Sequence, residues 1–440
     1  MKINILVLFF IFFGLQSAAN EYHPNALTVQ SRHIISPVKY CTPDVNDPKF
    51  SMQWYLRNNG QLIKDELNDL VHYDLHGLIY PAPEDSQQQC VINQDKQSDA
   101  DIGWRFVYKK IDALMKTDIV VAVIDRGADP KHPDLNYYKN EIECDEDEIN
   151  PKATEDRDGN GFVGDCMGWN FTQEFAPTKK RPRRDRASRQ REPRNSNART
   201  RPPRENPEPT EPEKIYPGSN RIDDDHGHGT HVAGLIAAKK GNNKFITSLS
   251  NRIKVLPLRV NRSLSEANFK ALRLARAKQQ NTSKDLNPRE EALLVEFSLE
   301  GSAQRIIKAI NYAIDLKKPN SDENVVNVIN LSLAWPRNAV SKATQDQLKA
   351  AIEKAIDQNI FIVVAAGNNR TNIKLDPCHI KGVLCVGSVD NSGYYSDFSN
   401  YGGQVNLLAP GQQILSLFPQ LKSLWKNQLY NQTGLNNVWY

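Results

Sequence analysis

Apolar runs and helical patterns alternate from about residue 116 to residue 411, and this alternation constrains the fold more than any other feature. The run 118–125 holds six consecutive apolar residues before its final acid, which is typical of a strand buried on both faces of a parallel sheet. Such an alternation predicts a three-layer α/β fold, with a mostly parallel central sheet and helices on both faces. The expected strands are 118–125, 253–260, 325–333, 360–367, 382–390 and 404–411, and the expected helices are 228–238, 302–316 and 343–356.

The first part of the chain predicts export. Residues 1–19 have the pattern of a signal peptide, in which Lys2 precedes an apolar stretch and small residues follow it. A membrane anchor is the alternative, but the apolar stretch is short for a span. Residues 20–115 are expected to form an N-terminal extension and the start of the main domain, which covers 116–440. We therefore expect a secreted or periplasmic/extracellular protein.

Two inserts interrupt the main domain. Residues 174–220 are rich in Arg, Pro, Glu and Asn and poor in large apolar residues, so we expect a disordered surface loop. Between Lys179 and Arg204 this loop carries twelve Lys and Arg against two acids. This basic stretch has no aromatic residues to stack on bases, so we expect no nucleic-acid partner. Residues 261–297 look partly helical. After the first residues, no segment is apolar enough to predict a membrane span.

Six cysteines fit an exported protein that forms disulfides. Proximity in the sequence suggests the pairs Cys41–Cys90, Cys144–Cys166 and Cys378–Cys385, although six cysteines allow about fifteen connectivities. A zinc site is the alternative, but the chain has no C-x-x-C motif.

Three residues are predicted to lie near the carboxyl ends of the strands, where parallel α/β sheets form their active sites. Asp125 ends a predicted strand and His228 opens a predicted helix, so a carboxylate could hold the imidazole Nδ1–H and leave Nε2 as a general base. Asn368 follows another strand end and could donate a hydrogen bond to a developing oxyanion. The acids 223–225 before the helix are expected to form an exposed turn.

The order of these motifs resembles that of the subtilisin-like serine proteases. Six short segments carry the resemblance, and they occur in the family's order. They are 47–61, 121–135, 228–238, 328–336, 363–369 and 398–411. The resemblance implies a subtilisin-like fold and a secreted, monomeric serine endopeptidase that acts on protein or peptide substrates. It assigns Asp125 to orient the imidazole, His228 as the base and Asn368 as the oxyanion donor.

The same resemblance suggests where a substrate would bind. The segment 300–303 resembles a strand that pairs with an extended peptide, so Gly301 and Ser302 are expected to offer backbone groups. The opposite wall would be formed by Ser332, Leu333 and Ala334. Trp335 either narrows the pocket or lies outside it.

The family's nucleophile motif, G-T-S-x-A-x-P, is absent from these 440 residues. Ser416 and Ser423 follow the last family segment, but neither has flanking glycines or a following helical pattern. We expect this chain to be truncated before the nucleophile and inactive as it stands, by a frameshift or an incomplete gene model. The alternatives are a pseudoprotease that binds extended peptides without cleaving them, and a nucleophile from another chain or residue.

The segment 156–165 predicts a structural calcium site. It offers the oxygen ligands Asp156, Asp158 and Asn160, and Asp165 could close the site. The position where an EF-hand needs its glutamate is a methionine, so the segment is not an EF-hand. Asp134 matches a family position for a calcium ligand. A solvated turn is the alternative.

Overall fold

The computed structural model describes residues 111–144, 153–172, 174–175, 215–216, 218–263, 266–280, 286–372, 375–390, 393–412 and 414–420. The predicted signal peptide, most of the N-terminal extension, the pair Cys41–Cys90, most of the basic insert and Ser423 lie outside these residues. Those predictions therefore stay predictions.

The centre of the molecule is a seven-stranded sheet in which every neighbouring pair of strands is parallel. The strand order is β11-β10-β8-β6-β1-β5-β2, so β1 lies between β6 and β5. All six expected strands are present. The strands of the sheet are β1 (Ile119–Asp125), β2 (Trp169–Asn170), β5 (Ile253–Arg259), β6 (Val326–Leu331), β8 (Phe361–Ala365), β10 (Leu384–Val389) and β11 (Leu407–Pro410).

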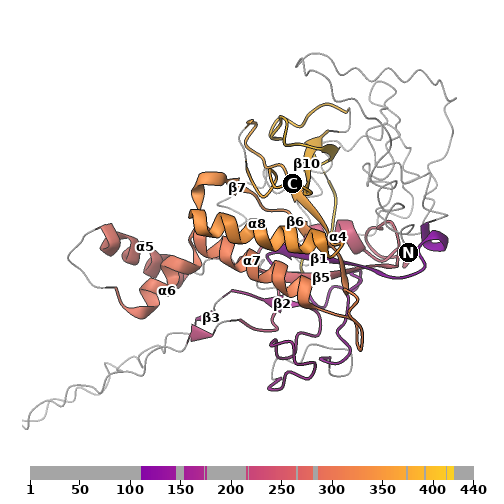
Figure 1. Cartoon of the computed structure of the whole chain (residues 1–440), viewed down its shortest axis with the longest axis horizontal. Coiled ribbons are helices and arrows are strands. Elements are labelled where there is room, and N and C mark those ends of the chain that lie inside the picture. The colour runs from indigo at the N-terminus through magenta and orange to yellow at the C-terminus, as the bar shows by residue number, and fades with distance from the viewer. Residues whose placement is uncertain are drawn as a thin grey trace, which may run out of the picture.

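The expected helices are present as well, and two short antiparallel pairs lie outside the sheet (Figure 1). The helices are α4 (His228–Ala237), α5 (Glu266–Gln280), α6 (Pro288–Glu296), α7 (Leu299–Asp315) and α8 (Lys342–Asp357), with a 3-10 turn at Arg337–Ala339. The short pairs join β3 (Glu174–Phe175) to β4 (Ile215–Tyr216), and β7 (Trp335–Pro336) to β9 (Leu375–Asp376).

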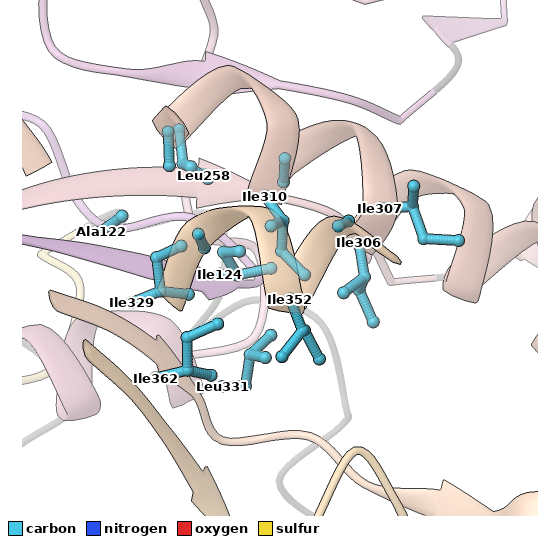
Figure 2. Close-up of a cluster of buried hydrophobic side chains, with 14 of the residues drawn as sticks. Ala122, Ile124, Leu258, Ile306, Ile307, Ile310, Ile329, Leu331, Ile352 and Ile362 are labelled. Atoms are coloured by element: carbon cyan, nitrogen blue, oxygen red, sulfur yellow. The ribbon is translucent and has the colours of Figure 1, made fainter. Parts of the chain in front are cut away.

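Side chains that alternate along β1 divide the core into two layers, because successive strand residues point to opposite faces. Ala122 and Ile124 pack in a cluster with the inner faces of α7 and α8 (Figure 2). Val121 and Val123 pack in a second cluster with Ala233 of α4. Helices therefore cover both faces of the sheet, and the expected three-layer α/β fold is confirmed.

The first cluster shows why α7 faces the sheet. Ile306 and Ile310 are separated by one helical turn and are both fully buried. They belong to one buried cluster with Ile124 and Leu258 from two neighbouring strands (Figure 2). Burial of each such side chain stabilises the fold by about 1.5–3 kcal/mol before the entropy cost.

Two of the three expected disulfides lie within the described residues. Cys144 and Cys166 are joined with an S–S distance of 2.02 Å, and Cys378 and Cys385 with one of 2.05 Å. The insert 261–297 contains α5 and α6, which lie beside each other at one end of the molecule (Figure 1). No described helix is long and apolar enough to cross a membrane.

Candidate active site

Asp125 and His228 meet at the carboxyl end of the central strand. Asp125 is the last residue of β1, and His228 is the first residue of α4. His228 Nδ1 lies 2.7 Å from Asp125 Oδ1, and the carboxylate is fully buried. The structure thus brings together two residues that are 103 positions apart in the sequence.

The environment of this pair makes the imidazole more basic. Asp125 Oδ1 also accepts a hydrogen bond from the main-chain N–H of Arg126 at 2.7 Å, which fixes the carboxylate. Burial lowers the pKa of His228, but the charge and hydrogen bond of Asp125 raise it by more, so the pKa lies above the ordinary 6.5. A proton on Nδ1 would leave Nε2 to exchange a proton with a substrate group.

Asp224 holds the loop that leads into His228, and the expectation of an exposed turn is wrong for this residue. Its side chain is fully buried. Its oxygens accept from the main-chain N–H groups of His226, Gly227 and Thr230 at 2.9, 2.8 and 2.8 Å, and from the Thr230 hydroxyl at 2.8 Å. The carboxylate satisfies N–H groups at the start of α4, where a helix needs partners from outside its own ladder.

Asn368 lies beyond the carboxyl end of β8, and its side chain is exposed. Gly367 before it has φ +96°, and a Cβ there would lie 2.6 Å from Asn400 Nδ2. Asn400 is fully buried, accepts from the N–H groups of Asn369 and Thr371, and donates to Ala366 O at 2.9 Å. Sequence reasoning missed Asn400, although it lies inside a family segment.

Ser332, Leu333 and Ala334 follow the end of β6 and are half-buried. The next residue, Trp335, is buried and pairs with Asp376 in a short antiparallel ladder, so its ring contributes to the core.

The expectation of an extended strand at 300–303 is wrong, because these residues form the first turns of α7. The N–H of Gly301 donates to the Ser298 hydroxyl at 2.9 Å, and the N–H of Ser302 donates to the Ser298 carbonyl at 3.1 Å. The Ser298 side chain caps the helix, so these backbone groups cannot pair with a peptide. The sequence signal for this helix start was Ser298, a residue type that caps helices by accepting from the N–H three residues later.

Three carboxylates gather at the predicted metal loop. Glu143, Asp156 and Asp158 offer oxygens that all lie within 4.8 Å of one another, so this cluster could hold a metal ion. Glu143 belongs to the acidic run 143–148, whose sequence favours a solvated surface, but it is almost fully buried. It accepts from the N–H groups of Asp158 and Gly164 at 2.9 and 2.8 Å. The predicted disulfide of the adjacent Cys144 could have located it, because Cys166 follows the loop directly.

The other predicted ligands are placed differently. Asn160 Nδ2 donates to Asp158 Oδ2 and to Asp165 Oδ2, so Asn160 and Asp165 lie beside the carboxylate cluster. Burial raises the pKa of Asp165 to about 6, and the Tyr312 hydroxyl donates to it at 2.6 Å. Asp134 accepts from Asn242 Nδ2 at 2.7 Å and is not one of the clustered carboxylates.

The Ser416 hydroxyl is engaged with the main chain of α4. It donates to the main-chain carbonyl of His231 at 2.6 Å, in the interior of α4. His231 Nε2 in turn lies 3.1 Å from the carbonyl of Ile414. These two hydrogen bonds hold the segment 414–420 against α4.

Two bacterial proteases are similar in sequence to part of this chain. The chain is 29% identical over 224 residues to the major intracellular serine protease of Bacillus subtilis (strain 168), covering 48% of this chain and 55% of that protein. It is 31% identical over 201 residues to the cell wall-associated protease of the same organism, covering 46% and 17%. The chain therefore spans about half the length of the first relative and less of the second.

Two solved structures show a weaker similarity. A protease from Pseudoalteromonas arctica PAMC 21717 is 19% identical with a TM-score of 0.42, covering 85% of this chain and 74% of that one. A cold-adapted subtilisin-like serine proteinase is 18% identical with a TM-score of 0.34, covering 69% and 67%. The family model described as Peptidase_S8, subtilase family, matches residues 116–439, a span that includes the whole sheet, Asp125 and His228. The chain belongs to the subtilase family of serine peptidases.

Proposed function

We propose that this chain supplies most of a secreted serine endopeptidase, in which Asp125 and His228 are two members of an Asp-His-Ser triad. The observation that carries the proposal is the 2.7 Å contact between His228 Nδ1 and the buried Asp125 carboxylate. An aspartate in this position holds the imidazole in one tautomer and stabilises the imidazolium ion that forms during acyl transfer.

The roles in the reaction follow from the chemistry of the groups. His228 takes the proton of the attacking serine hydroxyl through Nε2 and later gives it to the leaving amine. The Asn368 carboxamide donates to the oxyanion of the tetrahedral intermediate, a contact worth about 2.7–4 kcal/mol in such reactions. Asn400 positions Asn368 because it accepts from the N–H of Asn369 and donates its own N–H to the carbonyl of Gly367, each at 2.9 Å. Ser332, Leu333 and Ala334 line one wall for an extended peptide.

The serine of the triad would come from sequence outside these 440 residues. No G-T-S occurs in them, and Ser416 is bonded to the backbone of α4. A chain of these 440 residues alone would lack the nucleophile, and the alternative function is then to bind extended peptides without cleaving them.

Sequencing the locus past the codon for Tyr440 tests the source of the serine. A G-T-S-x-A-x-P box in any forward frame supports the endopeptidase, whereas its absence from all frames favours the peptide-binding alternative. A protein extended through such a box should be labelled by a fluorophosphonate and should hydrolyse casein. Both activities should be lost in His228→Ala and kept in Ser416→Ala. Casein hydrolysis that survives His228→Ala would contradict the assignment.

We extend the proposal to export and to a structural calcium ion. The two described disulfides fit an oxidising compartment such as the periplasm or the exterior. The cluster of Glu143, Asp156 and Asp158 fits calcium, which binds carboxylate oxygens. A calcium ion there would neutralise these acids beside the Cys144–Cys166 disulfide and stabilise the loop.

A further inference from the structure

The helical pair α5–α6 exposes large apolar side chains to solvent on its outward face. In the described part of the chain, four of the eight large hydrophobic side chains that are exposed belong to this pair and its junction with α7. Two of them are on α5, where Phe269 is 55% and Leu274 61% exposed. Exposed side chains of this size, gathered on and directly after one insert, indicate an interaction surface.

The inward face of α5 makes the contacts that hold this helix against the rest of the protein. Asn268, Leu272 and Ala275 are buried, and they follow the helical repeat along one side of α5. On α6, Leu293 is fully buried. Lys278 Nζ joins the two helices through Glu290, with N–O distances of 2.7 Å. The pair therefore has its own small core and does not need the outward face.

A buried ion pair fastens the helical pair to the rest of the molecule. Arg305 of α7 donates to Glu296 Oε2 at 3.0 Å and to the Glu296 carbonyl at 2.9 Å, and it also donates to the carbonyl of Val260 just beyond β5. Both side chains are almost fully buried. Since three attachment points converge on one guanidinium, α5 and α6 are held in place beyond the end of the sheet (Figure 1).

The outward face of α5 combines positive charge with the two apolar side chains. Lys270, Arg273 and Arg276 are all exposed, and residues 268–280 include no acid. At about 100° per residue, Lys270 and Arg273 lie between Phe269 and Leu274 around the helix. A helix that docks in a protein groove presents a continuous apolar stripe, which this face lacks. Basic residues that alternate with bulky apolar ones suit the boundary between anionic headgroups and acyl chains, where long cationic side chains reach the phosphates.

We propose that the α5 face formed by Phe269, Lys270, Arg273, Leu274 and Arg276 binds the surface of anionic lipid membranes. The rings and methyl groups enter the acyl boundary while the cations pair with lipid phosphates. The protein would then lie on the membrane without crossing it.

Flotation of the full chain with lipid vesicles tests the proposal. We expect binding to vesicles made of equal parts phosphatidylcholine and phosphatidylglycerol, and little binding to phosphatidylcholine alone. Phe269→Ser/Leu274→Ser should weaken the binding at least about tenfold, because two apolar side chains no longer leave water. Arg273→Gln/Arg276→Gln should weaken binding to the anionic vesicles by about fivefold for each charge removed.

A matched control uses two other exposed apolar side chains, one near the end of α6 and one at the start of α7. Val295 and Leu299 are 57% and 54% exposed, and they lie outside α5. Val295→Ser/Leu299→Ser should bind within about twofold of the parent, since their burial is not part of the contact. An equal loss in this control, or no binding of the parent chain to anionic vesicles, would overturn the proposal. A dimer of the parent that Phe269→Ser/Leu274→Ser dissociates, without vesicle binding, would instead assign the face to a second copy of the chain.

Discussion

Replacement of Asp224 is the most direct test of how the loop before His228 is built. The Asp224 carboxylate is fully buried and accepts four hydrogen bonds, three from main-chain N–H groups and one from the Thr230 hydroxyl. Alanine at this position would leave those donors without their acceptor. Since the loop ends at the residue that contacts Asp125, we expect both stability and the geometry of the His228–Asp125 pair to change.

The size of the effect follows from the number and kind of bonds lost. A hydrogen bond to a charged group contributes about 1.5–3 kcal/mol, and a buried donor without a partner costs about 1–3 kcal/mol. Removal of the carboxylate also removes the desolvation cost of burying its charge, which offsets part of the lost stability. The same desolvation raises the pKa of Asp224. We expect Asp224→Ala to lower the free energy of unfolding by about 3–5 kcal/mol, at the upper end for single substitutions. Asp224→Asn keeps one acceptor oxygen and should cost about half as much.

Urea denaturation followed by circular dichroism measures the change in unfolding free energy. The downfield proton resonance of the His228 Nδ1–H reports the contact with Asp125. Asp223→Ala is the matched control, because Asp223 belongs to the same acidic run and only its main-chain carbonyl is bonded, to Arg259 at 2.6 Å. It should cost less than about 0.5 kcal/mol. If Asp224→Ala costs less than about 1 kcal/mol, or no more than Asp223→Ala, the reasoning is refuted.

Three further predictions concern titration and metal binding. Asp125→Asn should bring the pKa of His228 below 6.5, because burial and the nearby Arg126 guanidinium then outweigh the weaker attraction of Asp224, the carboxylate that remains. An NMR titration of the His228 ring measures this pKa, and an unchanged value contradicts the prediction. Burial lowers the pKa of His132 from 6.5 to about 4. Between these two pH values the unfolded chain takes up a proton at His132 and the folded chain does not. The free energy of unfolding should therefore fall by up to about 3 kcal/mol as the pH drops from 6.5 to 4. His132→Asn should remove this part of the acid loss in urea titrations at several pH values, and an equal loss in the variant contradicts it. Calcium at about a hundredfold excess over its dissociation constant should stabilise the chain by about 3 kcal/mol. A melting temperature that still responds equally to calcium in Glu143→Gln would remove Glu143 from the proposed ligands.

The strands and main helices could be predicted because burial on two faces leaves a strong pattern. The run 119–124 is apolar throughout, since alternate residues meet α4 on one face and α7 with α8 on the other. Helix α7 likewise shows its buried isoleucines at helical spacing. The ends of these elements shifted, because strand ends depend on the neighbours that hydrogen-bond to them, and the two-residue strand β2 was not predicted.

The failures have a different origin, because they depend on contacts between segments that are distant in the sequence or on local caps. Glu143 lies in an acidic run that looks solvated, and only folding places it beside Asp156 and Asp158. Asp224 lies in a second such run, where the neighbouring aspartates are partly exposed. Composition cannot tell which acid of a run is buried. The residues 300–303 were matched to a strand by resemblance, although the Ser298 cap favours a helix there.

The contact between His228 and Asp125 depends on glycine as much as on the two side chains. A Cβ at Gly229 would lie 1.9 Å from the carbonyl oxygen of Gly127, and a Cβ at Gly127 would lie 2.1 Å from that of Ile222. Both distances involve backbone atoms, so the clashes could be relieved only if α4 and the loop before it moved away from the segment that follows β1. Because glycine has no Cβ, the backbone at Gly229 can approach the backbone at Gly127 this closely. The close approach allows the imidazole of His228 on α4 to lie 2.7 Å from the carboxylate of Asp125 at the end of β1. The glycine after the histidine in H-G-T-H is thus part of the geometry of the base.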